Sequence, residues 1–171
     1  MIPSDHFVKF YNEIFKYLEK KGPGELDRYY KCVADRQAYF TLDAFKRDGF
    51  KGMYDYWERI RIEENCDMEH EYDNSHYHLR MRTCPSLSKV LDNDATPCAR
   101  YCDHCPGWVG RVIAWAGYFM VDDIIGRETP QCDIWVYRTR EEAQAKYDEA
   151  AALHGPGVVA TNFRHIGENA Q

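Results

Sequence analysis

The sequence predicts an α+β fold in which N-terminal helices pack on a small antiparallel sheet, with further helices after a cysteine-rich segment. Residues 1–60 carry apolar side chains at helical spacing. From residue 61 the pattern changes to a period of two, which is typical of strands. We therefore expect a single domain over residues 1–171, made of a helical part (1–60), a mixed part that contains the cysteine-rich segment (61–157) and a weakly structured tail (158–171).

The composition is that of an acidic globular domain. The chain has 171 residues, of which 44% are hydrophobic, so it is long enough to bury one core. A net charge of −6 argues against a nucleic-acid partner, because polyanion binding needs a basic surface. No apolar run reaches the ~20 residues of a membrane helix, and the amphipathic N-terminus lacks a signal-peptide pattern. We therefore expect a cytoplasmic protein without a membrane partner, whose seven cysteines are thiols or ligands rather than disulfides.

Four helices are expected before the strands. The first has an apolar stripe formed by Phe7, Phe10, Tyr11, Ile14, Phe15 and Leu18, and it ends at residues 22–24, Gly-Pro-Gly. A second helix is expected from Glu25 to Phe40, a third, capped by Thr41, up to Gly49, and a fourth from Met53 to Ile60. The aromatic side chains of these helices are expected to pack on the following hairpin or on a second subunit.

A hairpin is expected next, with strands over residues 61–72 and 75–83 joined by Asp73 and Asn74. This pairing sets acids opposite bases, which is favourable across strands. The expected pairs are Glu71 with His76, Glu69 with His78, and Asp67 with Arg80. The two histidines are therefore interpreted as partners of acids, although their H-x-H spacing would also suit a metal.

The remaining elements alternate between helices and strands. Cys84-Pro85 ends the hairpin and opens a short helix to Leu91, which a loop over residues 92–97 follows. A helix is expected from Trp108 to Gly117, then strands over residues 118–121 and 132–137, with Asp122 and Asp123 in a turn between them. A Thr139-x-x-Glu142 capping box predicts a last helix from Arg140 to Leu153.

The segment from Cys84 to Cys105 holds four of the seven cysteines. Cys98, Cys102 and Cys105 would share one face of a helix, where buried thiols behave as small hydrophobic groups. The same three could bind zinc or an iron–sulfur cluster, with Cys132, Cys84 or His104 as the fourth ligand. A third interpretation makes one thiol reactive.

A reactive thiol needs a lowered pKa, which a helix N-terminus or a neighbouring imidazole can provide. Cys105 lies beside His104 and just before the helix expected from Trp108. Cys84 lies before Pro85 at another helix start. Cys84, His104 and Cys105 are therefore the candidate catalytic residues, and packing, metal binding and catalysis all remain open for the cluster.

Several of these motifs together resemble the L-2-amino-thiazoline-4-carboxylic acid hydrolase family. They are the strand ending in Cys84-Pro85, the block Tyr101-Cys-Asp-His-Cys105, the pair Gly117-Tyr118 and the late strand that carries Cys132. The resemblance implies an α+β hydrolase that cleaves a non-peptide C–N bond in a small cyclic amidine-like carboxylate.

Under this resemblance, a thiolate of Cys105 or Cys84, or an activated water, would attack the amidine carbon while His104 moves protons. Arg80 or Arg82 would hold the substrate carboxylate, although cross-strand pairing also explains them. The alternative is a metal- or small-ligand-binding module that uses the cysteine cluster without turnover.

Overall fold

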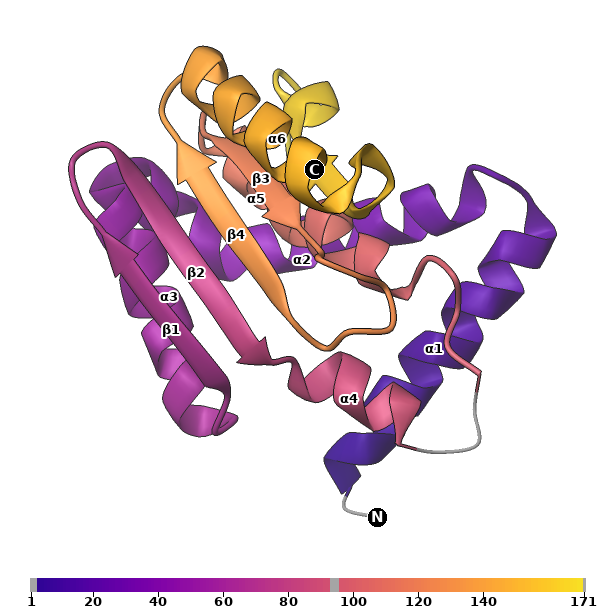
Figure 1. Cartoon of the computed structure of the whole chain (residues 1–171). Helices are drawn as coiled ribbons and strands as arrows, with labels where there is room; N and C mark the ends of the chain where they lie inside the picture. Colours follow the sequence, from indigo (N-terminus) through magenta and orange to yellow (C-terminus); the bar gives the residue numbers. More distant parts are fainter. Residues whose placement is uncertain (1–2, 93–95, 171) are drawn as a thin grey trace.

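The computed structural model describes residues 3–92 and 96–170 and confirms the predicted α+β fold (Figure 1). One antiparallel sheet has the strand order β1-β2-β4-β3-β5. The strands are β1 (Asp67–Tyr72), β2 (His76–Thr83), β3 (Phe119–Asp123), β4 (Cys132–Tyr137) and β5 (Val159–Thr161). The α-helices are α1 (Pro3–Lys21), α2 (Glu25–Asp48), α3 (Phe50–Glu63), α4 (Pro85–Leu91), α5 (Gly110–Trp115) and α6 (Arg140–His154).

Helices cover both faces of the sheet. The main core lies between the sheet and α2, α3 and α5, and includes Phe45, Met53, Tyr77, Met120 and Val136. A smaller core under α6 includes Val121 and Ala143. A third core joins α1, α2 and α4 to the cysteine-rich segment through Phe15, Tyr30, Leu87 and Tyr101.

In the described part of the chain, no helix combines the length and the apolar character that crossing a membrane requires.

Two helices are longer than predicted. α2 continues through residue 48, so Thr41 does not cap a new helix; it is buried, and its hydroxyl donates to the carbonyl of Gln37 at 2.9 Å. α3 includes residues 61–63, which were predicted as strand. Side-chain pairs one turn apart support this extension, since Arg59 binds Glu63 at 2.7 Å and Arg61 binds Glu58 at 2.7 Å.

The apolar stripe of α1 is only partly core. Phe15 is fully buried, but Phe7 and Phe10 are 62% and 60% exposed. The neighbours of α1 are α2 and α4, which cover one side of the helix (Figure 1). For α1, packing on the hairpin is therefore not what the described residues show, and packing on a second subunit stays a prediction.

The hairpin forms in a register that differs by two residues from the prediction. Glu71 pairs with His78, Glu69 pairs with Arg80, and a bulge follows Asp67, which pairs with Thr83. The side chain of Asp73 causes the shift, because its Oδ1 accepts from the backbone N–H groups of Ser75 and His76 at 2.7 and 3.0 Å. The turn therefore consists of residues 74 and 75, and an even shift leaves each side chain on its predicted face.

The C-terminal segment is part of the fold rather than a loose tail. β5 pairs with β3, which itself extends through Asp122 and Asp123, the residues predicted as a turn. Asn162 is fully buried and joins three backbone groups. Its Oδ1 accepts from the N–H of Met120 at 2.8 Å, and its Nδ2 donates to the carbonyls of Gly110 and Tyr118, both at 3.0 Å.

Other local predictions are confirmed. α4 begins at Pro85 and ends at Leu91, and β4 has the predicted bounds. The capping box at Thr139 forms, and α6 ends one residue later than expected. The loop predicted after α4 falls partly outside the described residues, since these omit positions 93–95.

Gly107 allows the cysteine-rich segment to pack against α2. A Cβ atom on Gly107 would lie 2.4 Å from Cδ2 of Tyr30, a ring that is itself buried. We predict that Gly107→Ala lowers the free energy of unfolding by about 1–3 kcal/mol, measured by urea denaturation. Gly157→Ala is the matched control, because a Cβ there meets nothing within 4 Å. Equal midpoints for the two variants would contradict this close contact.

Candidate active site

Four thiols, an imidazole and a carboxyl group line one small pocket of about 30 Å³, roughly the space of one water molecule. The cysteines come from distant parts of the chain: Cys84 precedes α4, Cys102 and Cys105 lie in the turns before α5, and Cys132 begins β4. The other lining residues are Leu87, Tyr101, His104, Asp122, Ile124, Thr129 and Gln131. Cys84, His104 and Cys105, predicted as catalytic, therefore do meet in one place.

The local backbone explains how these side chains converge. Cys84 is the N-cap of α4, where its Sγ accepts from the N–H of Leu87 at 3.4 Å. Its own N–H donates to the carbonyl of Pro130, which ties the loop before β4 to the start of α4. Residues 101–103 form a 3₁₀ turn and residues 105–109 a π-helical turn, a geometry often found at functional sites.

Cys98 lies apart from the pocket lining. Because residues 98–105 do not form a continuous α-helix, the predicted shared face of Cys98, Cys102 and Cys105 does not exist. The buried thiol of Cys98 donates to Oε2 of Glu19 at 3.1 Å, and its backbone N–H donates to Oδ1 of Asn12 at 2.7 Å. Cys98 therefore anchors the segment to α1.

His104 is held as a neutral base. Its Nδ1 lies 2.6 Å from the carbonyl oxygen of Tyr101, and a carbonyl can only accept, so Nδ1 carries the proton. Burial lowers the pKa of His104 to about 4, despite that hydrogen bond and the charge of Asp103. At neutral pH its Nε2 is therefore unprotonated and able to accept a proton.

Asp122 is the functional candidate that the sequence prediction missed. It lies in β3 opposite Ile134 and Ala160, is 1% exposed, and its Oδ1 has no hydrogen-bond partner among the described residues. Burial raises the pKa of Asp122 to about 7, and the negative charges of Asp123 and Asp103 add to this effect. A buried carboxyl group without a partner is costly, which makes it a functional candidate.

The pocket thiols are not activated in this state. Burial raises the pKa of Cys102 to about 12 and raises the pKa values of Cys105 and Cys132 well above the ordinary value, with Asp122 contributing to each. The pKa of Cys84 is also raised, because burial outweighs the backbone N–H groups of Ser86 and Leu87. The expected lowering by a helix N-terminus or by His104 does not occur.

The two predicted substrate-binding arginines lie on the opposite face of the sheet. Arg80 pairs across the strands with Asp133, whereas Cys132 and Ile134, the neighbours of Asp133, face the other way. The Nε of Arg80 donates to Oδ1 of Asp133 at 2.9 Å, and Arg82 binds Glu69 at 2.8 Å. These arginines thus form cross-strand ion pairs away from the thiols, so the structure does not bring them to the thiol-lined pocket.

A preformed metal site is not found in the part of the chain that the structure describes. No group of three or more His, Cys, Asp or Glu side chains there is arranged to hold a metal ion. The two hairpin histidines contact acids, as interpreted from the sequence: His78 lies 2.6 Å from Asp133 and His76 lies 3.5 Å from Asp73. For His78 the partner comes from β4 rather than from β1.

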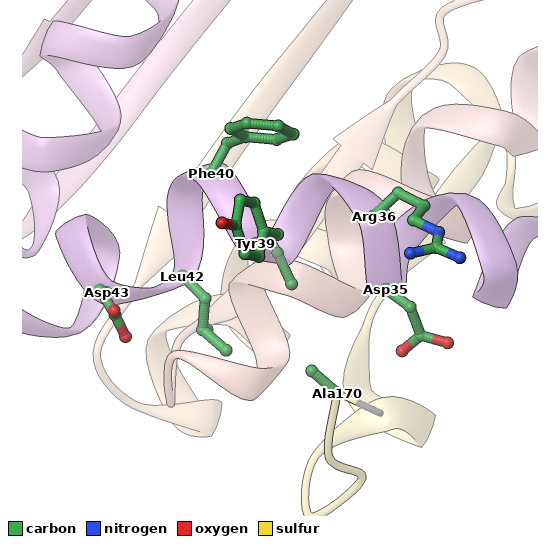
Figure 2. A pocket seen from close by; sticks show the side chains of 8 residues that line it. Asp35, Arg36, Tyr39, Phe40, Leu42, Asp43 and Ala170 are labelled. Atoms are coloured by element: carbon green, nitrogen blue, oxygen red, sulfur yellow. The ribbon is translucent and has the colours of Figure 1, made fainter.

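A larger hollow lies along α2 but lacks comparable chemistry. Its volume is about 540 Å³, and Figure 2 shows Tyr39 and Phe40 above it and Ala170 at its far side. Its charged residues, which are Asp35, Arg36 and Asp43, include no buried group. We therefore place the candidate active site in the thiol-lined pocket.

No family model, no curated protein and no solved structure matches this chain.

The pKa of Asp122 predicts a specific pH dependence of stability. An unfolded aspartate releases its proton near pH 3.8, but the folded state keeps it to about pH 7, so the folded state binds more protons between these values. The free energy of unfolding should therefore fall as pH rises through this window, by a few kcal/mol. We predict a flatter profile for Asp122→Asn in urea denaturation from pH 4 to 8.

The exposed Asp43 supplies the control for this measurement. Asp43→Asn makes the same substitution at a carboxylate that the solvent hydrates. An Asp122→Asn profile as steep as that of wild type would contradict the raised pKa.

Proposed function

We propose that this protein is a hydrolase of a non-peptide C–N bond in a small cyclic amidine-like carboxylate of the L-2-amino-thiazoline-4-carboxylate type. The observation that carries the proposal is Asp122, whose buried carboxyl group has an unpartnered oxygen and lines the same pocket as the neutral His104. The thiol-lined pocket is the proposed active site.

An amidine suits this carboxyl group chemically. Amidine nitrogens donate and accept hydrogen bonds in one plane, and a carboxyl group can match both in a two-point contact. A pKa of about 7 lets Asp122 either give or take a proton at neutral pH. The partner that Oδ1 lacks in the described structure would be an amidine N–H.

The proposed reaction uses water as the nucleophile. Nε2 of His104 accepts a proton as water attacks the amidine carbon, and the carboxyl group of Asp122 donates its proton to the ring nitrogen that takes up the C=N electron pair. When the tetrahedral intermediate collapses, the C–OH group becomes C=O, the ring C–N bond breaks, and the imidazolium of His104 donates its proton to the leaving nitrogen. The hydroxyl proton that is released returns to the carboxylate of Asp122 through water, which restores both resting states.

The raised pKa values of the thiols favour water over a cysteine as the nucleophile, because few thiolates exist at neutral pH. In this state the pocket holds only a water-sized guest. Binding of a ring therefore requires the pocket to widen, and the loop between β3 and β4 contributes Ile124, Thr129 and Gln131 to its lining.

We predict that Asp122→Asn and His104→Gln each lower kcat/KM by roughly 10²–10⁴-fold, because each removes a proton-transfer group. Cys84→Ser and Cys105→Ser should each change kcat/KM by less than about tenfold. The assay follows ring opening of L-2-amino-thiazoline-4-carboxylate, with circular dichroism to verify folding.

Asp133→Asn is the matched control, since Asp133 lies on the neighbouring strand β4 and binds Arg80 at 2.9 Å on the opposite face of the sheet. It should keep wild-type turnover. Loss of activity in Cys84→Ser or Cys105→Ser alone would indicate a thiol nucleophile instead. Wild-type protein that lacks turnover but carries stoichiometric zinc or iron, lost in Cys102→Ser, would favour the metal-binding alternative.

A further inference from the structure

A further cavity, of about 350 Å³, is lined in part by the segment that carries the pocket thiols. Arginines from three separate parts of the chain line it: Arg100 before the 3₁₀ turn, Arg127 in the loop after β3 and Arg164 after β5. The only carboxylate among its lining residues is that of Asp103. In a chain of net charge −6, this is a local concentration of positive charge.

One carboxylate orients two of these arginines. The Nε of Arg100 donates to Oδ2 of Asp103 at 2.8 Å, and Nη1 of Arg127 donates to its Oδ1 at 2.7 Å. Arg164 is fixed separately, because its Nη2 donates to Oδ1 of Asp27 at 2.8 Å. The three guanidinium groups are therefore positioned before any ligand arrives.

Most of their hydrogen-bonding capacity is unused. A guanidinium group carries five N–H donors. The contacts within the described residues use Nε of Arg100, Nη1 of Arg127, and Nε and Nη2 of Arg164. The remaining donors can bind an anion without breaking these contacts.

We propose that this cavity binds a small molecule through an oxyanion group, a carboxylate or a phosphate, held by Arg100, Arg127 and Arg164. Guanidinium groups bind both oxyanions in two-point contacts, and the cavity volume is in the range of small-ligand sites.

This cavity is distinct from the thiol-lined pocket, but the positive charge of Arg127 affects pKa values in that pocket. Arg127 lowers the pKa values of Asp122 and Cys102 against the effect of their burial. An anion bound at Arg127 offsets that positive charge. The proposal stands whether or not the thiol-lined pocket hydrolyses amidines, because the test measures binding alone.

Isothermal titration calorimetry with inorganic phosphate and with malonate, at low ionic strength and pH 7, tests the proposal. Arg127→Gln and Arg164→Gln should each weaken binding at least tenfold. Arg59→Gln is the control, since this exposed arginine of α3 pairs with Glu63 and should leave binding unchanged. A preference for one probe identifies the group as phosphate or carboxylate.

Absence of binding by either probe at millimolar concentration would overturn the proposal. Wild-type affinity in Arg164→Gln would do the same, provided that the variant melts at the wild-type temperature. Arg164 does not contact Asp103, so this variant keeps the test decisive if Arg127→Gln fails to fold.

Discussion

Side-chain alternation along three paired strands determines which chemical groups can meet in this protein. Asp122 and Cys132 lie on the face that the main core covers, while Asp123 and Asp133 lie on the face toward α6. A slip of one residue in the pairing of β3 with β4 would exchange these sets. The register thus places Asp122 on the same face of the sheet as Cys132. Side-chain alternation along β2 and β4 keeps Arg80 on the other face.

Burial disfavours charge on every titratable group of the pocket. The pKa of Asp122 is raised to about 7, His104 is unprotonated at Nε2 at neutral pH, and the thiols stay protonated. Each of these side chains is commonly charged or reactive in an active site, and the same desolvation shifts each toward its uncharged form here. A polar guest would therefore meet proton donors and acceptors rather than fixed charges.

The sequence was informative where the signals are local. The capping box at Thr139, the proline-started α4 and the alternation in β4 depend on neighbouring residues, and all were predicted correctly. Several contacts between distant residues were predicted wrongly. The hydrogen bonds of Asp73 shift the hairpin register. His78 binds an acid of β4 rather than one of β1. Asp122 and Asp123, which were predicted as a turn, belong to a buried strand. The role of Asp122 depends on its pairing with strands formed later in the chain, so no local pattern could reveal it.

The buried Asn162 has a consequence for synthesis on the ribosome. Backbone groups of Gly110, Tyr118 and Met120 receive their partners only from a residue made more than forty positions later. Until then β3 has an open edge on the side that β5 will occupy, and Asp122 lies on that strand. A nascent chain that already contains every pocket residue therefore still lacks the support of the pocket. A premature stop after α6 would harm the site without removing any side chain from it.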